Sequence, residues 1–402
     1  MIVSPPLDGR ASPRHNAPMA RQPKPEPTPI PKPVTAAGPP EAEAGGILTI
    51  DLGAIFDNYR ALAVRVMPTE CAAVVKGDAY GCGIDQVTAT LSRAGCKTFF
   101  VAHLDEARRV RALAPEAAIY VLNGYTSGTG PAFTEVYARP VINSSVEFAE
   151  WDQFVAASGW RGGVGLHVDT GMNRLGLSLD ETAAVAMRMQ TENHGLTLLM
   201  SHFACADRAQ HPLNDQQIRQ FREIRTLFRG IPGSLANSSG IFLDQSAYCD
   251  MVRPGAALYG VNPTPGRPNP MKPVIELRSR VLQMRSVPRN ATVGYGATWT
   301  AKRASRIAMV AAGYADGILR AAGAAERDVL VAGKRCRIVG RISMDLLAVE
   351  VTDLPDSAIR RGDLVTLIGG ELGVDAVGAQ AGTIGYEVLA SLGGRYHRNW
   401  KV

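Results

Sequence analysis

The stretch Ala72-Ala73-Val74-Val75-Lys76-Gly77-Asp78-Ala79-Tyr80-Gly81 shows the unit from which most of this chain is built. Four consecutive apolar residues that end at a polar residue predict a short buried strand. The glycines that follow predict a tight turn. The same order, an apolar run that ends in polar residues and precedes a helical pattern, recurs along the chain as far as Val252.

Eight apolar runs in this part of the chain are predicted to be strands. They are Ala72–Val75, Thr98–Ala102, Ile119–Leu122, Pro140–Ile142, Val164–Val168, Leu196–Met200, Ser234–Ala236 and Met251–Val252. Between them apolar residues recur at helical spacing, as at Ile218, Phe221, Ile224 and Phe228. Eight strands alternating with helices in the roughly 210 residues from Leu48 onward are typical of a (β/α)₈ barrel of the TIM type.

A polar or ionisable residue follows each predicted strand within one or two positions. These residues are Lys76, His103, Asn123, Asn143, Asp169, His202, Asn237 and Arg253. Any one of them could simply mark the end of a strand. In a parallel barrel, however, all eight positions share the rim at which active sites are built. Eight such positions that include a lysine, a histidine and an arginine favour an active site at this rim.

The pattern changes after Pro273. Six predicted strands then follow with only short turns between them: Val274–Val287, Arg306–Ala312, Val329–Val331, Arg337–Val339, Leu346–Val351 and Leu364–Ile368. Helical patterns return at Val374–Ala381 and Tyr386–Leu392. We therefore predict an α/β protein in which a barrel, residues 47–273, is followed by a mainly antiparallel β domain, residues 274–402.

Composition narrows the functional class. The chain has 402 residues, a formal net charge of +6 and no long run of basic residues, which disfavours a nucleic-acid partner. It also has no window of about 18 consecutive apolar residues, so we expect no transmembrane helix. The six cysteines are scattered without metal-binding spacing, as is typical of a reduced, cytoplasmic protein.

Residues 1–46 differ in composition from the rest of the chain. Prolines alternate with other residues from Pro23 to Pro33, and this pattern favours an extended, disordered head. No apolar stretch in the head is long enough for a secretory signal.

Lys76 is the most informative single residue. A lysine at the mouth of a barrel can be partly desolvated, which lowers its pKa and makes the neutral amine available. Neutral amines form imines with carbonyl compounds, pyridoxal 5'-phosphate (PLP) among them. A solvated lysine with no chemical role remains the alternative on this residue alone.

Further motifs resemble the alanine racemase family, whose members are fold type III PLP-dependent enzymes. The resemblance begins with the Lys76 stretch and continues in order through both predicted domains. It is carried by residues 168–176 (VDTGMNRLG), 201–204 (SHFA), 236–238 (ANS), 253–260 (RPGAALYG), 294–298 (GYGAT), 313–317 (GYADG), 343–345 (SMD) and 382–387 (GTIGYE).

The resemblance implies roles for particular residues. It implies that the chain interconverts L-alanine and D-alanine by a two-base mechanism in the cytoplasm and so supplies D-alanine for peptidoglycan. Lys76 would carry PLP and act as one base, and Tyr295, contributed by the partner subunit of a homodimer, would be the other. Cofactor-binding positions would be Lys76, Tyr80, His202, Asn237, Ser238, Arg253, Gly255, Ala256 and Tyr386. Arg174 and Met344 would bind the substrate, and Asp207, Tyr314 and Arg341 would line the entrance.

The chain departs from the family pattern at His167. Many family members have a lysine here, seven residues before the arginine that corresponds to Arg174, and this lysine carries a carbamate that orients the arginine. Histidine cannot hold a stable carbamate. We therefore expect His167 itself or a bound anion to orient Arg174. Asn173 also stands where glycine is frequent.

Other functions remain open at this point. A broad-spectrum or serine racemase would share the fold, although Leu175 after Arg174 resembles the alanine-specific form. A PLP decarboxylase would share the two-domain plan but has glycine-rich and cysteine motifs that we do not find. A non-catalytic PLP-binding homeostasis protein would be a lone barrel, whereas this chain adds a second domain that carries Tyr295 and Met344.

Overall fold

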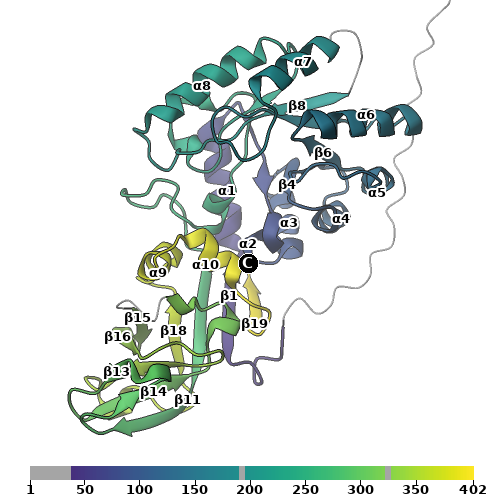
Figure 1. Cartoon of the computed structure of the whole chain (residues 1–402). Coiled ribbons are helices and arrows are strands. Elements are labelled where there is room, and N and C mark those ends of the chain that lie inside the picture. Colours follow the sequence, from purple (N-terminus) through teal and green to yellow (C-terminus); the bar gives the residue numbers. More distant parts are fainter. Residues whose placement is uncertain (1–37, 190–194, 322–326) are drawn as a thin grey trace, which may run out of the picture.

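The computed structural model describes residues 38–189, 195–321 and 327–402. Within these ranges the chain forms two units, an α/β barrel and a β-rich domain that extends away from it (Figure 1). This arrangement confirms the predicted fold class. Residues 1–37 of the predicted disordered head, residues 1–46, lie outside the described residues.

Parallel strands form the barrel. Its segments are β2 (Glu70–Cys71), β3 (Ala73–Val74), β4 (Thr98–Val101), β5 (Ala118–Val121), β6 (Arg139–Ile142), β7 (Val164–His167), β8 (Leu196–Met200), β9 (Gly233–Ser234) and β10 (Met251–Val252). β2 and β3 are consecutive parts of one extended segment. β2 pairs with β10 and β3 pairs with β4, so this segment closes the barrel.

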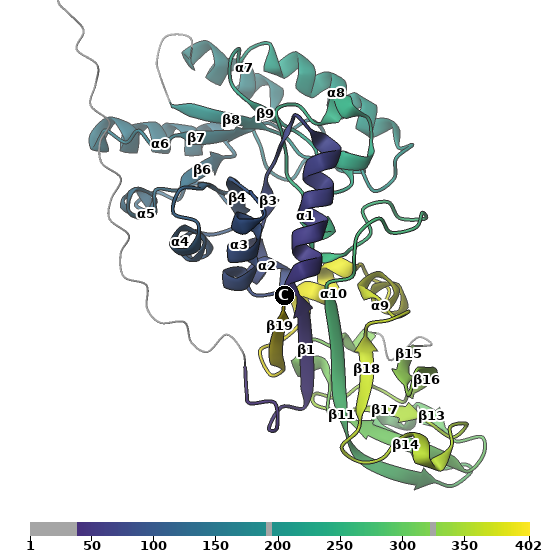
Figure 2. The same cartoon turned by 180° about the vertical axis from the view of Figure 1, so that it is seen from behind.

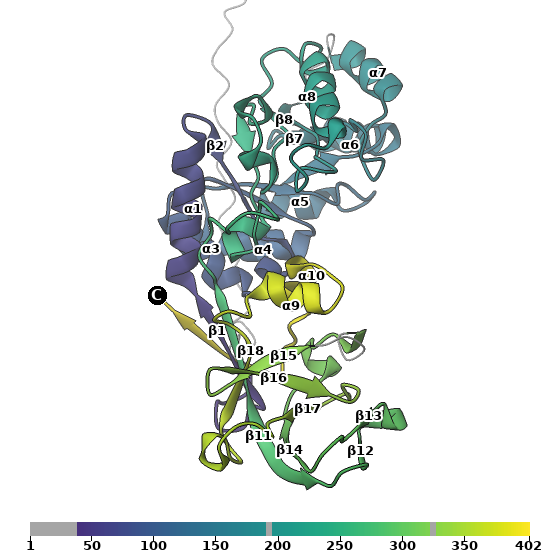
Figure 3. The same ribbon diagram turned by 90° about the vertical axis from the view of Figure 1, so that its left-hand side faces the viewer.

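Helices cover the outside of the barrel (Figures 1 and 3). They are α1 (Leu52–Val66), α3 (Ile84–Arg93), α4 (Leu104–Leu113), α5 (Gly130–Val136), α6 (Ser145–Ser158), α7 (Leu179–Met189) and α8 (Pro212–Arg225). In α3 the buried side chains Ile84, Val87, Thr88 and Leu91 recur at helical spacing, which places one face on the strands. No described helix is both long and apolar enough to cross a bilayer.

The interior of the barrel is filled by side chains from six of its strands. One buried cluster contains Ala72, Val74, Phe100, Tyr120, Val141, Leu198, Met200 and Met251. The Phe100 and Tyr120 rings stack with their centroids 5.1 Å apart. The barrel therefore has a packed core, and any cavity must lie above this layer at the rim.

The second sheet is mainly antiparallel. Its strands are β11 (Ile275–Val287), β14 (Ser305–Val310), β15 (Asp328–Val331), β16 (Lys334–Val339), β17 (Leu347–Glu350), β18 (Leu364–Ile368), β1 (Gly46–Asp51) and β19 (His397–Lys401). The first part of β11 pairs with β18 and its last part with β14, which curls six strands into a small closed sheet. Burial alternates along the first half of β11, as expected when one face packs on a core.

Two strands from the ends of the described chain extend this sheet. β1 precedes the barrel in sequence but pairs antiparallel with β11, and β19 pairs parallel with β1 (Figure 2). The apolar pattern did not predict either strand. Helices α9 (Val374–Gln380) and α10 (Gly385–Ser391) lie between the sheet and the barrel, and α10 contacts the segment that follows Lys76.

Asn58 links α1 to the segment that leaves the barrel. Its side-chain amide donates to the carbonyl oxygens of Leu258 and Lys272 at 3.2 and 3.0 Å, and its Oδ1 accepts from the amide of Lys272 at 2.8 Å. Asn58 is 2% exposed, so no water can replace these partners easily.

We predict that Asn58→Ala lowers the free energy of unfolding by about 2–4 kcal/mol, because it leaves buried backbone groups without hydrogen-bond partners. Urea unfolding followed by circular dichroism would measure the change. The matched control is Asp57→Ala, which removes only a solvent-exposed ion pair with Lys272 and should change stability little. Equal losses in the two variants would contradict the prediction.

Candidate active site

A cavity of about 860 Å³ opens at the rim of the barrel where the strands end. Its walls contain seven of the eight polar residues that follow the predicted strands; Asp169 is the exception. Asp169 instead accepts hydrogen bonds from the amides of Gly171, Met172 and Asn173. These bonds hold the loop before Arg174, in which Asn173 has a left-handed φ of 54°. Asparagine tolerates this conformation well, which explains why it can replace glycine here.

Lys76 lies in this cavity, partly buried, at the end of β3. Burial lowers the pKa of its amine, and the positive charge of Arg174 lowers it further, whereas the carboxylate of Glu106 opposes the shift. A larger fraction of neutral amine is therefore present at neutral pH than in a solvated lysine.

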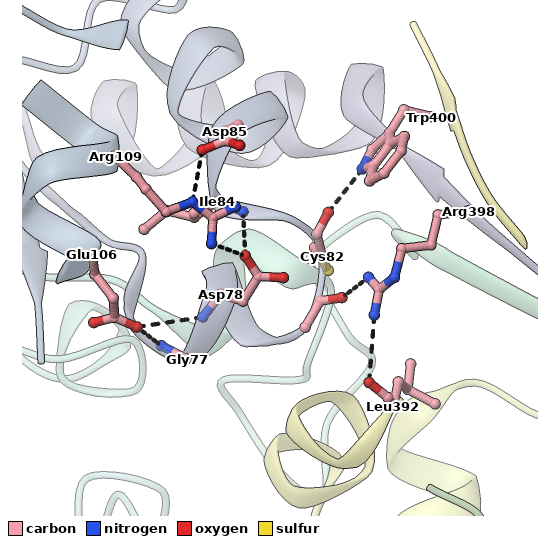
Figure 4. A network of polar contacts seen from close by, with 11 residues as sticks. Gly77, Asp78, Cys82, Ile84, Asp85, Glu106, Arg109, Leu392, Arg398 and Trp400 are labelled. Atoms are coloured by element: carbon pink, nitrogen blue, oxygen red, sulfur yellow. Dashed lines mark hydrogen bonds and ion pairs between the residues drawn. The ribbon is translucent and has the colours of Figure 1, made fainter. Parts of the chain in front are cut away.

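The segment after Lys76 is held by Glu106. Residues 77–80 have φ values between 52° and 66°, so they form a left-handed turn. Glu106 Oε1 accepts hydrogen bonds from the amides of Gly77 and Asp78, at 2.5 and 3.4 Å. Its Oε2 accepts from the amides of Ala102 and His103, at 2.8 and 3.3 Å. One carboxylate thus connects the turn that carries Lys76 to the end of the neighbouring strand, as Figure 4 shows in part.

Arg253 forms the deepest charged part of the site. It is 3% exposed, and it donates to Ser234 Oγ and to the carbonyl oxygens of Ser201 and Leu235. It also donates to His202 Nδ1 at 3.4 Å. Because a guanidinium only donates, Nδ1 must be the unprotonated nitrogen of His202. Burial, together with the positive charge of Arg253, lowers the pKa of His202 well below 6.5, so this histidine is neutral.

Hydroxyl and amide groups gather on another wall of the cavity. Ser238 Oγ accepts hydrogen bonds from the amides of Gly255 and Ala257, at 3.0 and 3.2 Å. Its own hydroxyl hydrogen is therefore available to an acceptor in the cavity. A Cβ atom at Gly255 would lie 2.4 Å from the hydroxyl oxygen of Tyr80, so only glycine permits this close approach.

Further sequence-predicted residues complete this wall. Asn237, Ala256 and Tyr386 also line the cavity, and the ring of Tyr386 lies 6.3 Å from that of Tyr80. Asp207 is exposed and does not line the cavity. The pKa of Tyr386 is raised by burial and by the negative charges of Asp207 and Asp375.

The donors present fit PLP. Ser238 and the neighbouring hydroxyl groups suit a phosphate, and Lys76 suits an aldehyde. Arg253, which can only donate, suits an unprotonated ring nitrogen. The apolar side chains of Phe100, Leu122 and Met200, which also line the cavity, suit the face of an aromatic ring.

His167 and Arg174 lie on the remaining side of the cavity. His167 Nδ1 is 2.9 Å from Asn143 Oδ1. The side-chain nitrogen Nδ2 of Asn143 donates to the carbonyl oxygens of Leu122 and Val141, so the side-chain oxygen Oδ1 must be the acceptor from His167. His167 therefore carries its proton on Nδ1 and presents Nε2 as an acceptor, which is compatible with orienting a guanidinium.

Four predicted site residues lie outside this cavity, on the β-rich domain. Tyr295 and Met344 are 71% and 52% exposed, and Tyr314 is 43% exposed. Tyr295 and Arg341 line a separate cavity of about 330 Å³. The amides of Tyr314 and Ala315 donate to the carbonyl oxygens of Ser343 and Met344, so the loops that carry these residues are adjacent. Within one chain the structure does not bring these four residues to Lys76.

Sequence reasoning missed Glu106, which lines the cavity and supports Lys76. It also missed Ile384, Glu387 and Ala390, which α10 and the residue before it contribute to the cavity. A signal for Glu106 did exist, because it stands a few residues after the end of a predicted strand. It is the third residue of α4, and a glutamate at this position commonly accepts hydrogen bonds from the amide at the start of the helix. No local pattern distinguishes the residues of α10.

The fold and the cavity together define a two-domain barrel enzyme with a lysine at its catalytic rim. Models of the alanine racemase N-terminal and C-terminal domains match residues 50–263 and 274–400. An alanine racemase of Methylobacterium sp. (strain 4-46) is 51% identical over 354 residues, covering 88% of this chain and 97% of that protein. A catabolic alanine racemase of Mesorhizobium japonicum is 44% identical over 371 residues, covering 92% and 97%.

Solved structures agree with these relatives. The crystal structure of alanine racemase from Bartonella henselae with covalently bound pyridoxal phosphate superposes with a TM-score of 0.85 at 38% identity, covering 89% of this chain and all of that chain. The biosynthetic alanine racemase of Pseudomonas aeruginosa superposes with a TM-score of 0.82 at 38% identity, covering 89% of this chain and 100% of that chain. The chain belongs to the alanine racemase family and is an isomerase.

The buried His167 predicts a pH dependence of stability. Burial, together with the positive charges of Arg253 and Arg174, lowers its pKa to about 4 although Asp169 opposes the shift. In the unfolded chain histidine has a pKa near 6.5. As the pH falls from about 6.5 to 4, the unfolded chain therefore binds a proton at this residue and the native state does not. Stability is complete above this range and decreases within it.

We expect His167→Gln to reduce the loss of stability between pH 7.5 and pH 5 by about 2 kcal/mol. A residual slope should remain from His202, whose pKa shift has the same sign. Urea midpoints of both proteins at pH 7.5 and pH 5 would show the reduced loss, with pH 7.5 and 8.5 as the control interval in which the two slopes should agree. Parallel curves throughout the acidic range would contradict the assignment.

Proposed function

We propose that this protein interconverts L-alanine and D-alanine with PLP and two bases, as a homodimer in the cytoplasm, and supplies D-alanine for peptidoglycan. The observation that carries the proposal is one cavity that contains Lys76 with a lowered pKa, the guanidinium groups of Arg174 and Arg253, and the Ser238 donor wall. Membership of the alanine racemase family agrees with it.

PLP would be held by Lys76, Arg253, Ser238 and Tyr386, with Tyr80, His202, Asn237, Gly255 and Ala256 around it. When bound, PLP withdraws electrons from the amino acid and makes its α-hydrogen more acidic. The Bartonella henselae relative, solved with covalently bound pyridoxal phosphate, supports this choice of cofactor.

Lys76 acts on one face of the substrate. Its lowered pKa makes the neutral amine available to accept the α-proton, and the protonated amine can return a proton to the same face. Glu106 favours the charged form electrostatically and holds the turn that carries the lysine. Arg174 provides a planar pair of donors for the substrate carboxylate, and His167 Nε2 is available to orient it.

Racemisation requires a second base on the opposite face. Tyr295 is the proposed base, with Met344 at the substrate and with Tyr314, Arg341 and Asp207 along the entrance. Because Tyr295 projects from its own β-rich domain and does not line the cavity of Lys76, it is proposed to act in the cavity of a partner subunit. Each homodimer would then contain two shared sites.

The reaction itself can be tested in heavy water. Incubation with L-alanine should give D-alanine in which deuterium has replaced the α-hydrogen, because the proton is exchanged with a base and the solvent during inversion. Chiral chromatography with mass spectrometry measures both products. L-Serine in parallel tests a broader substrate range, and Lys76→Ala is the control. Release of carbon dioxide or complete inertness would refute the proposal.

Sharing of sites between subunits can be tested by complementation. Lys76→Ala and Tyr295→Phe homodimers should each be inactive, whereas subunit exchange should produce heterodimers with one intact site and up to about one quarter of the wild-type activity, assuming random mixing and one productive site per heterodimer. The matched control is a mixture of the Lys76→Ala protein with the double variant that carries both Lys76→Ala and Tyr295→Phe. It should stay inactive, because no subunit in it has Lys76. No recovery after verified exchange would place both bases in one chain.

A further inference from the structure

The turn after Lys76 is conformationally costly. Asp78, Ala79 and Tyr80 all have left-handed φ values, between 52° and 55°, in sequence. A side chain with a Cβ atom is disfavoured in this conformation, and Ala79 has no polar side chain to offset the cost. Lys76 directly precedes the turn and Tyr80 is its last residue, and both line the cavity.

Hydrogen bonds within the segment offset part of this cost: the amides of Gly81 and Gly83 donate to the carbonyl oxygens of Gly77 and Asp78, both at 2.9 Å. Contacts from outside the turn add to these bonds and so help to fix the position of Lys76.

Barrel residues hold the beginning of the turn. Glu106 accepts from the amides of Gly77 and Asp78. Asp78 Oδ1 accepts from the amide of Ile84 at 3.0 Å and from Arg109 Nη1 at 2.9 Å. These contacts fix amide groups and the Asp78 side chain, but they do not satisfy the carbonyl oxygens at the end of the turn.

The end of the turn is held from the other domain. Arg398, on β19, donates through Nη1 to the carbonyl oxygen of Gly81. Trp400, two residues later on the same strand, donates through Nε1 to the carbonyl oxygen of Cys82 at 2.9 Å. These carbonyl groups belong to the two residues that directly follow the turn, at the end of a short helical segment where carbonyl groups lack internal partners. Figure 4 shows Arg398 and Trp400 on the side opposite Glu106 and Arg109.

Packing reinforces these two hydrogen bonds. Arg398 Nη2 also donates to the carbonyl oxygens of Leu392 and Gly393, which connects the turn to the end of α10. A Cβ atom at Gly81 would lie 2.4 Å from the carbonyl oxygen of Leu389, and one at Gly83 would lie 3.0 Å from the ring of Trp400. The backbone of residues 81–83 therefore lies directly against α10 and β19.

We propose that Arg398 and Trp400 are positioning residues for Lys76: the last strand of the β-rich domain holds the left-handed turn in the geometry that directs the lysine into the cavity. The inference rests on the proposed function, because it takes Lys76 to be the cofactor-bearing base. It assigns to β19 a function in the site although neither residue lines the cavity.

The test compares Arg398→Gln and Trp400→Phe with Lys401→Gln in the holoenzyme. Trp400→Phe keeps an aromatic ring but loses the donor. Lys401 lies on the same strand and pairs with Asp51 at 3.0 Å instead of contacting the turn, so it is the matched control. Arg398→Lys retains the positive charge but replaces the two guanidinium nitrogens with a single ammonium group, and it should give intermediate values.

Three measurements are expected to change together in Arg398→Gln and Trp400→Phe. Hydrogen exchange of amides 77–83, measured by mass spectrometry, should accelerate by at least about tenfold because the turn opens more often. The Kd for PLP, from equilibrium dialysis, should increase. The kcat for L-alanine should fall by about 10- to 100-fold with a smaller change in KM, because a displaced base loses reaction geometry more than substrate binding.

The outcomes separate this inference from the proposed function. Wild-type protein that does not racemise alanine would refute the proposed function, whereas the exchange measurement would still report on the turn. The positioning role would be overturned if both variants had the same hydrogen-exchange rates, PLP affinity and kcat as the wild-type protein. Faster exchange throughout the protein with a matching loss of thermal stability would also overturn it, because the residues would then support the fold in general.

Discussion

Closure of the parallel barrel is the constraint on which the remaining features depend. Parallel strands that close on themselves must all end at one rim, so residues far apart in sequence become neighbours there. The extended segment from Glu70 to Val74 makes the closure by pairing with β10 in its first part and β4 in its second. Lys76 lies two residues after the end of this segment. The proposed cofactor-bearing lysine is therefore attached to the strand that completes the barrel.

The electrostatics of the rim follow from burial among positive charges. Arg253 is fully enclosed and bonded to neutral acceptors, and its charge helps to keep His202 and His167 neutral. Neutral histidines can accept hydrogen bonds from arginines, whereas protonated ones would repel them. Lys76 is affected in the same way, since both burial and Arg174 lower its pKa. Within the described chain, the positive charges of the site are not each paired with a buried carboxylate, so they can bind anionic ligands.

The β-rich domain contributes to the barrel in two different ways. Its strand β19 and helix α10 contact the turn that follows Lys76, so part of the support for the cavity comes from residues near the end of the sequence. Its other functional candidates, Tyr295 and Met344, lie exposed at a distance from the cavity of their own chain. A second domain that only stabilised the barrel would not need to expose a tyrosine and a methionine in this manner.

The sequence by itself determined the fold class and the polar residues of the rim, because burial in a parallel strand and polarity at its end are local patterns. It also predicted, through family resemblance, ten of the residues that line the cavity. Only the tertiary structure decided that β1 joins the second sheet, that residues 77–80 are left-handed and that Glu106 holds them. The same is true of Arg398, which reaches a carbonyl group 317 residues earlier in the chain. Such contacts depend on how distant segments pack, so the periodicity of apolar residues cannot predict them.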